Sequence, residues 1–405
     1  MRQIPPRPDT DEPAYANRSK TDAEPDLMLT QGGPAHALMR RLRLIHPEAR
    51  TATTRTGLIL AAITWVPLCL LSLLEGLAFG GVPIPFFHDI GVHVRFLLAV
   101  PILILADIPI GVRLRQVARH FLTAGLISEA QTPRYREIIM SARRLRDSRV
   151  AELVLVGLAY FGTYRAMGGP THAGGTWFRP SAGLTAVGYW YAFVSMPIWI
   201  FLVWRWAFRM IVWSRFLWQV SKMDLVLTPS HPDGAGGLGF LGKGIIPFGI
   251  IAFALSAVIS GAVASRIMFS GARLEDFQSV FIVLVLFILI FFTGPLLVFA
   301  PRLIILRQTG LLRYGTLASR YTLLFDRKWV ESAETTDQRI LGHDDIQALG
   351  SLGESYDLIR RMKVIPMEPN DFIAFALPMV IPALPLILTV VPLKVIVSDL
   401  VRLIA

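Results

Sequence analysis

The sequence predicts an all-α fold: a polytopic membrane helix bundle of about seven spans with a small cytoplasmic helical hairpin. Three observations predict it. Of the 405 residues, 53% are hydrophobic, only 17% are charged, and long apolar runs recur along the chain. This composition suits lipid-spanning helices and excludes disordered, collagenous and disulfide-stapled classes. The one cysteine, Cys69, cannot form an intrachain bridge.

Seven apolar runs have close to the roughly 20 residues that a bilayer core of about 30 Å requires. They are residues 57–79, 94–112, 150–168, 184–204, 245–267, 278–300 and 372–391. The lipid bilayer is therefore the first expected partner. Four prolines between residues 378 and 392 leave two alternatives open for the last run, one kinked crossing or a re-entrant hairpin. We favour one crossing.

These runs divide the chain into four regions. Residues 1–36 are rich in Pro, Asp, Arg, Ser and Gly, and we expect a disordered cytoplasmic tail there. Residues 37–303 hold spans one to six, with cytoplasmic helical extensions at 113–149 and 205–243. Residues 304–370 form the cytoplasmic hairpin, and residues 371–405 form the last span or re-entrant segment.

Two apolar stripes at helical spacing predict the hairpin, because neither amphipathic helix can bury its stripe alone. A polar turn through residues 331–338 separates the stripes. The first stripe comprises Leu312, Leu317, Tyr321, Leu324, Phe325 and Trp329, and the second comprises Ile346, Leu349, Leu352, Tyr356, Ile359 and Met362.

The basic residues indicate the orientation of the chain. The formal net charge is +11. Lys and Arg number 9, 9, 5 and 10 in residues 1–56, 113–149, 205–243 and 302–370, against 0, 1 and 1 in the alternate loops 80–93, 169–183 and 268–277. By the positive-inside rule, the N-terminus and the basic loops face the cytoplasm. Topology thus explains most of the basic residues, and no nucleic-acid partner is expected.

Asp107 is the first candidate for chemistry within the membrane. Pro109 cannot bond the carbonyl of Leu105, so a free backbone oxygen lies within one turn of an intramembrane carboxylate. Cation and proton sites are often built in this way. The alternative is that Asp107 pairs with a neighbouring arginine, Arg205 or Arg209, for stability alone.

Small side chains mark the fifth span. Ser256 and Ser260 fall four residues apart on a face almost free of large side chains. Such a face lets helix backbones approach closely or lines a polar path with hydroxyls. Close packing is the favoured interpretation of the two.

Four further charged residues lie within or beside spans: Glu75, Arg95, Glu152 and Arg165. A charge buried alone in a membrane costs several kcal/mol, so we expect intramembrane charge pairs. Glu75 is expected to pair with Arg95 or Arg165, since all three should lie at similar depth. These pairs favour a structural role.

A glycine-rich stretch precedes the fifth span, with candidate residues His231, Asp233, Gly236 and Gly237. The glycines let the backbone turn its amides toward an anion, and the histidine with the aspartate could bind a metal or move a proton. However, the spacing is neither the phosphate-loop nor the dinucleotide pattern, and one His with one Asp falls short of a metal site. The alternative is a tight turn beneath the bundle. No cofactor or metal is expected.

Two stretches of the chain, within residues 204–239 and 345–356, carry a resemblance to a known family. The tryptophan- and arginine-rich run 204–218 and the following loop 231–239, with the residues Asp345 to Leu349 and Ser355-Tyr356, are similar to bacterial multi-spanning inner-membrane proteins. They cover under a quarter of the chain. The resemblance implies a bacterial inner-membrane location and no activity, substrate or catalytic residue. Physically, the run 204–218 is typical of an interfacial belt.

Two function classes follow. The first is a channel or carrier for a small ion or solute, with a path past Asp107, Ser256 and Ser260. The alternative is a non-transporting scaffold or signalling component, in which the basic loops and the hairpin dock a cytosolic protein. No nucleophile–base pair, metal constellation or paired carboxylate stands out, so an enzyme is not expected. Homo-oligomerisation is left open.

Overall fold

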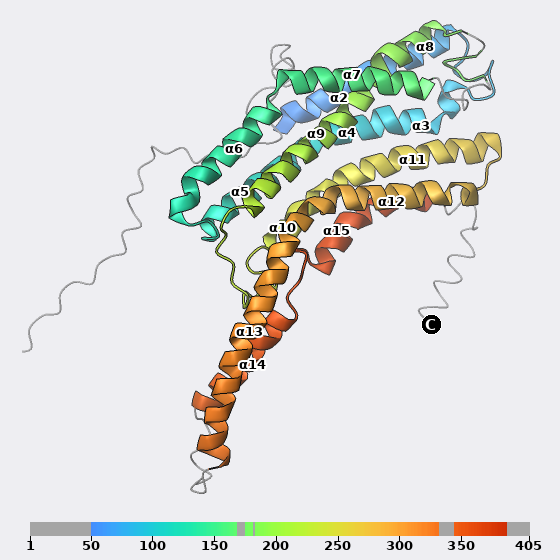
Figure 1. Ribbon diagram of the computed structural model, residues 1–405. Helices are drawn as coiled ribbons and strands as arrows, with labels where there is room; N and C mark the ends of the chain where they lie inside the picture. The colour runs from blue at the N-terminus through green and yellow to red at the C-terminus, as the bar shows by residue number, and fades with distance from the viewer. Residues whose placement is uncertain (1–49, 168–174, 181–182, 332–343, 387–405) are drawn as a thin grey trace, which may run out of the picture.

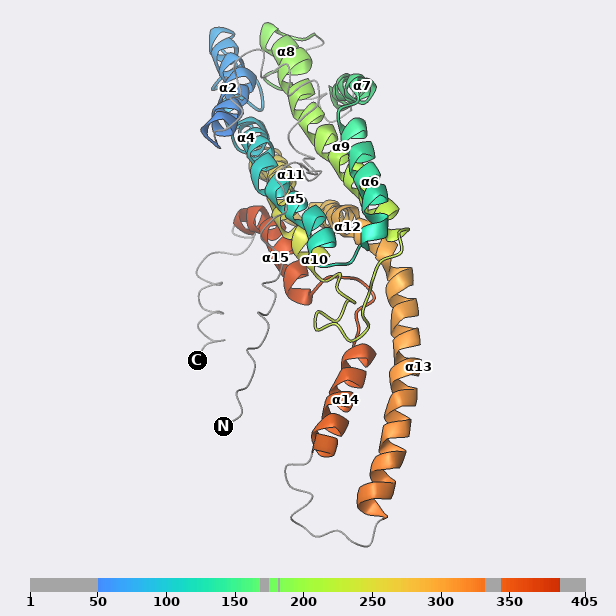
Figure 2. The ribbon, with the colours of Figure 1, turned by 90° about the vertical axis from the view of Figure 1, so that its left-hand side faces the viewer.

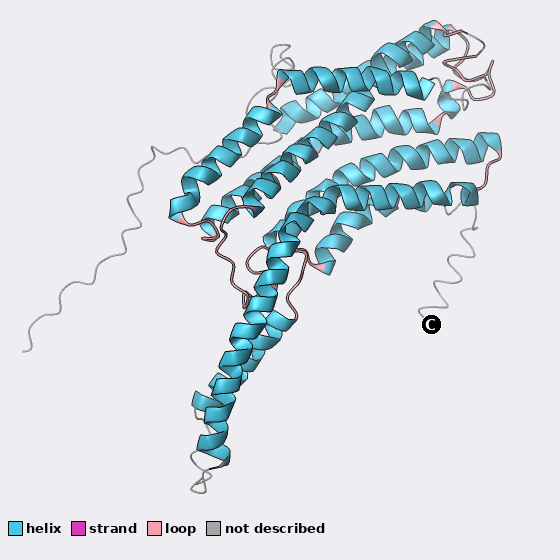
Figure 3. Cartoon of the chain, in the orientation of Figure 1, coloured by secondary structure: helices cyan, strands magenta, loops and turns pink. Residues whose placement is uncertain are grey.

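The computed structural model describes residues 50–167, 175–180, 183–331 and 344–386. Within these ranges the regular structure is helical, and β contacts are limited to isolated bridges that join Thr176 to Ile84 and Arg179 (Figure 3). Seven helical segments are long and apolar enough to cross a membrane. The prediction of an all-α polytopic bundle is confirmed, and the chain is a multi-pass membrane protein.

The first two spans pack against each other. α2 (Arg50–Leu74) is followed by one 34-residue segment. This segment comprises α3 (Ile90–His93), η2 (Val94–Ala99), α4 (Val100–Leu105) and α5 (Asp107–Thr123), and α4 lies along α2. The π-turn η2 ends just before Pro101, whose missing N–H disturbs the helical ladder.

The third and fourth spans share α9. α6 (Thr132–Arg146) and α7 (Arg149–Met167) both pack on the helix formed by α8 (Ala186–Trp190), η5 (Tyr191–Ser195) and α9 (Met196–Ser221). α6 buries Tyr135, Ile138 and Ile139. The Tyr135 hydroxyl donates to the Ala118 carbonyl of α5 at 2.7 Å, and burial raises the pKa of this phenol. Thus α5, α6 and the end of α9 form a packed extension beyond the spans.

α11 lies at the centre of the bundle. It spans Gly249–Ser270 and directly follows α10 (Phe240–Ile245) and η6 (Ile246–Phe248). It packs on α3, η2, α4 and α15 (Pro369–Val380). The short turn η11 (Ile381–Ala383) extends α15, and another short turn, η3 (Glu129–Gln131), precedes α6. A Cβ at Gly261 would lie 3.1 Å from the Val94 side chain. The small residues of α11 therefore permit close helix contacts.

One continuous helical segment, Leu274–Val330, has 57 residues. It comprises η7 (Leu274–Phe277), α12 (Gln278–Thr293), η8 (Gly294–Phe299), α13 (Ala300–Phe325) and η9 (Asp326–Val330). At 1.5 Å per residue it is about 85 Å long, far more than the roughly 30 Å of a bilayer core. Its second half must therefore leave the membrane, and Figures 1 and 2 show it projecting from the bundle.

α14 (Asp344–Arg360) returns along α13, and we call α13, η9 and α14 the hairpin. Asp345 joins the two helices, because its carboxylate accepts from Lys328 at 2.5 Å and from Trp329 at 3.2 Å. One detail of the prediction is wrong. Leu312, Leu317 and Leu324 of the expected buried stripe are 74%, 52% and 64% exposed, because α14 covers a different face of α13.

Some predictions fall outside the described residues. The expected tail 1–36, most of the hairpin turn and residues 387–405 are among them. The choice between a crossing and a re-entrant last segment therefore stays a prediction, although residues 369–386 count among the seven candidate spans.

Candidate functional site

Asp107 and Arg209 form an ion pair between the second and fourth spans. The two terminal guanidinium nitrogens of Arg209 donate to the carboxylate, Nη1 to Oδ1 and Nη2 to Oδ2 at 3.1 Å. The Arg209 side chain is 8% exposed and that of Asp107 is 25% exposed. Arg209 also lies over the Trp206 ring, 4.7 Å from its centre. This bidentate geometry fits the stabilising alternative for Asp107.

The two serines of α11 lie in helix contacts. Ser256 donates its hydroxyl to the Met379 carbonyl of α15 at 2.6 Å. Ser260 is buried, and its hydroxyl has no hydrogen-bond partner among the described residues. Ser265, one turn further, donates to Gly261 and accepts from the Gly91 amide of α3 at 3.3 Å. The hydroxyls of Ser256 and Ser265 thus bind backbone groups rather than one another.

Glu75 and Arg95 have partners that the sequence analysis did not foresee. Glu75 accepts from the backbone N–H groups of Ala186 and Val187, at 2.8 and 3.4 Å, and so stabilises the N-terminus of α8. Arg95 donates to the Tyr191 hydroxyl at 2.8 Å. Arg165 lies exposed on α7. Within the described chain Glu75 thus binds helix amides through Oε1 rather than either arginine, and its buried Oε2 has no hydrogen-bond partner there.

The glycine loop, residues 228–239, is organised around Asp233. Its carboxylate accepts from the backbone N–H groups of Ala235, Gly237 and Gly239 at 2.8, 3.2 and 2.8 Å. His231 Nδ1 lies 2.9 Å from the same carboxylate. Burial alone would raise the pKa of Asp233, but these contacts outweigh burial and lower it. The amides proposed to cradle an external anion therefore bind a carboxylate of the protein itself.

Backbone geometry requires the glycines of this loop. Gly236 and Gly237 have φ of 66° and 98°, a region that side-chain-bearing residues rarely adopt. A Cβ at Gly236 would also lie 2.7 Å from the Leu306 side chain of α13. These two features favour the interpretation of the loop as a tight turn.

The glycine loop connects the bundle to the base of the hairpin. The Lys363 amide, just after α14, donates to the Gly234 carbonyl at 2.7 Å. Pro229 packs on Gly310 of α13, where a Cβ would lie 2.8 Å from the proline ring. In Figure 2 the loop lies between the bundle and the hairpin. Sequence reasoning missed Gly310 and Lys363, because nothing in their local pattern indicates a contact about 80 or more residues away.

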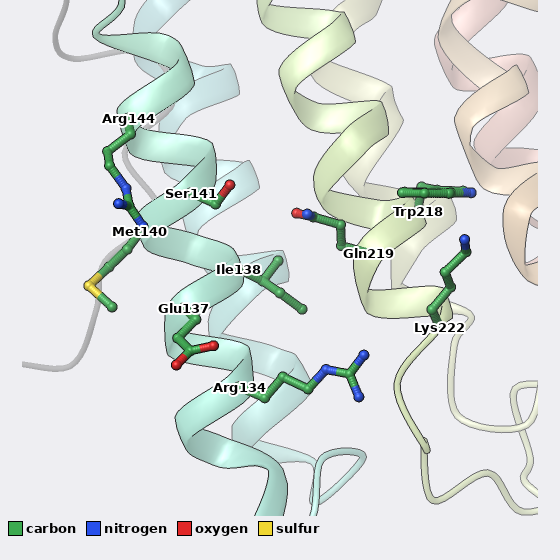
Figure 4. A pocket seen from close by; sticks show the side chains of 9 residues that line it. All are labelled: Arg134, Glu137, Ile138, Met140, Ser141, Arg144, Trp218, Gln219 and Lys222. Carbon is green, nitrogen blue, oxygen red and sulfur yellow. The ribbon is translucent and has the colours of Figure 1, made fainter.

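An open basic groove separates α6 from the end of α9 and has a volume of about 640 Å³. Figure 4 shows Arg134 pointing toward α9 and Lys222 beside Trp218. The Lys222 ammonium lies 3.6 Å from the centre of the Trp218 ring. The lining holds three cations, the third being Arg144, and one carboxylate, so it attracts anionic groups.

A second, apolar groove of about 400 Å³ runs between α7 and α9. A cavity of about 30 Å³ beside Glu152, Arg205 and Arg209 lies at one end. Asp107, Ser256 and Ser260 line none of these three cavities.

Among the residues that the structure describes, no group of three or more His, Cys, Asp or Glu side chains could hold a metal ion. No protein-family model, curated protein or solved structure matches the chain.

Proposed function

We propose that this membrane protein is a non-transporting scaffold or signalling component of the bacterial inner membrane, whose hairpin docks a cytosolic protein. The observation that carries the proposal is the exposure of large apolar side chains on the hairpin. Leu312, Leu323 and Val330 are 74%, 60% and 71% exposed, although the hairpin lies outside the apolar spans (Figure 1). Large apolar side chains that are exposed outside the membrane are candidates for contact with a partner.

We call these three exposed residues the apolar face. Leu312 and Leu323 are separated by 11 residues of α13, close to three whole turns of a helix with 3.6 residues per turn, and Val330 ends the π-helical turn η9 that follows. α14 packs on another side, where Gly310 lies near Ile359 and Tyr321 donates to the Asp345 carbonyl. The apolar face is therefore open to a partner.

The charge of the hairpin indicates the chemistry of that partner. Arg313, Arg320 and Arg327 lie along the same helical segment. Electrostatic complementarity favours a partner that presents acidic residues around an apolar strip. A cytoplasmic position agrees with the positive-inside rule, since this region has the largest number of basic residues.

The channel or carrier hypothesis is the second candidate. Its support is the buried Ser260 hydroxyl, which has no hydrogen-bond partner among the described residues. We rank it second because Asp107 is held by Arg209.

Photo-crosslinking in native membranes tests the docking proposal. A photoreactive amino acid in place of Leu323 should give one discrete adduct with a soluble protein, identified by mass spectrometry. The double substitution Leu312→Ser with Val330→Ser should remove the adduct, because it makes the apolar face polar. The matched control is the same amino acid at Glu354, an exposed position on α14, where no adduct is expected.

The purified soluble protein should then bind the wild-type hairpin and not the double variant. Adducts only with lipid, or only with a second copy of this chain, would overturn the docking of a cytosolic protein. So would equal labelling at Leu323 and Glu354.

A further inference from the structure

The apolar groove between α7 and α9 has the dimensions of one lipid chain. Its lining on η5 and α9 extends from Phe193 to Leu202. At 1.5 Å per residue this is about 14 Å, close to half of the roughly 30 Å hydrocarbon core of a bilayer. The groove therefore matches the depth of a single leaflet.

The groove opens sideways, toward the position that lipid occupies. Tyr160 and Phe193 at its edge are 48% and 57% exposed, whereas Ala159 at its floor is 1% exposed. Leu60 of α2 contributes to the lining, so three helices shape it. A concave surface of apolar side chains that faces the membrane excludes a polar occupant.

Arginine lies at the end of the groove nearer the basic loops. Phe201 lines both the apolar groove and the small cavity that contains Arg205. Of the other arginines there, Arg209 is paired with Asp107, and Arg146 lies 2.6 Å from Asp147. Arg205, in contrast, makes no hydrogen bond or ion pair with any residue that the structure describes.

An arginine with five N–H donors at a membrane interface is stable only where those donors find acceptors. A phosphodiester supplies them, because its oxygens match the planar guanidinium in a bidentate arrangement. Glu152 lines the same cavity, and its negative charge and that of Asp107 offset part of the charge of Arg205.

We propose that this groove is a binding site for one glycerophospholipid from the leaflet on the side of the basic loops. One acyl chain fills the groove beside Ala159, and the phosphodiester accepts hydrogen bonds from Arg205. The site is independent of the docking function proposed for the hairpin.

Lipid retention measured by native mass spectrometry tests the proposal. The full-length protein is purified in detergent and mixed with phosphatidylethanolamine or with diacylglycerol of the same chains. The wild type should retain one phosphatidylethanolamine and little diacylglycerol. Arg205→Gln should lower retention about tenfold or more, because a charge-assisted hydrogen bond contributes about 1.5–3 kcal/mol and 1.4 kcal/mol is a factor of ten.

Two variants block the groove itself. Ala159→Trp, and the milder Ala159→Leu in case the larger side chain prevents folding, should displace the acyl chain and abolish retention. The matched control is Val283→Trp on α12, where the native side chain is 65% exposed and lines neither cavity. This control should retain lipid as the wild type does. Circular dichroism and gel filtration check that each variant is folded.

Equal retention by the wild type and both Ala159 variants would overturn the site. Equal retention of diacylglycerol and phosphatidylethanolamine would overturn the role of Arg205. A second copy of the chain seated in the groove, detected as a dimer that Ala159→Leu dissociates, would overturn lipid as the occupant.

Discussion

The Asp107–Arg209 pair stabilises the junction where the second and fourth spans leave the apolar bundle. Arg209 is 8% exposed, so its charge depends on the carboxylate and on the Trp206 ring for compensation. Removing one partner of a buried pair leaves the other charge uncompensated, which costs more than the pair itself contributes.

Asp107→Asn should therefore lower the thermal stability of the protein in detergent. The expected loss lies between the roughly 1 kcal/mol of an exposed pair and the about 3–5 kcal/mol of a buried one, because Asp107 is 25% exposed. Asp107→Asn combined with Arg209→Gln should recover part of it. A single variant that unfolds like the wild type but abolishes a pH-dependent flux in vesicles would favour the carrier hypothesis instead.

Sequence reasoning at this scale was accurate where partners are charged side chains and failed where they are backbone groups. Arg209 was one of two arginines expected beside Asp107, because opposite charges at similar depth must pair. The partner of Glu75 was missed. Its donors are amides at the start of α8, 111 residues away, and every helix offers such amides, so no residue type identifies them.

At the scale of elements, apolar runs predicted the spans because the length of a run must match the thickness of the bilayer core. Continuity between elements was harder to predict. Pro295 and Pro301 fall in the first turns of η8 and α13, where proline is tolerated, so one helical segment runs from the membrane into the hairpin. The direction of an amphipathic face also depends on the partner helix, which is why Leu312 and Leu324 are exposed.

Gly310→Ala should loosen the base of the hairpin. The added Cβ would lie 2.8 Å from Pro229 and 3.1 Å from Ile359, so the glycine loop and α14 must both move. Overpacking of this kind costs about 1–3 kcal/mol. Hydrogen exchange should accelerate in α14 and the glycine loop, while the spans stay protected.

The matched controls for this change are Gly350→Ala and Gly353→Ala in α14, where an added Cβ meets nothing within 4 Å. Each should slow exchange slightly, because alanine is about 1 kcal/mol better than glycine inside a helix. Identical exchange in Gly310→Ala and the controls would contradict the role of this contact.

For the whole molecule, orientation decides what each surface can meet. One side of the spans carries the glycine loop, the basic groove and the hairpin, and Figure 1 shows α6 and α13 extending from the spans on that side. The docking proposal needs that side to be cytosolic. The charge asymmetry of the loops, up to 10 basic residues against 0 or 1, supports this.

Cysteine labelling of intact bacterial cells checks the orientation. The chain has one cysteine, Cys69, so a Cys69→Ser background leaves no other thiol. With a membrane-impermeant maleimide, Glu275→Cys in the loop before α12 should react in intact cells. Thr228→Cys in the glycine loop should react only after permeabilisation. Residues 228 and 275 are both exposed, so only the side of the membrane on which each lies distinguishes them. The reverse pattern would place the hairpin outside the cytosol and remove its access to any cytosolic protein, whereas the lipid site would persist in the opposite leaflet.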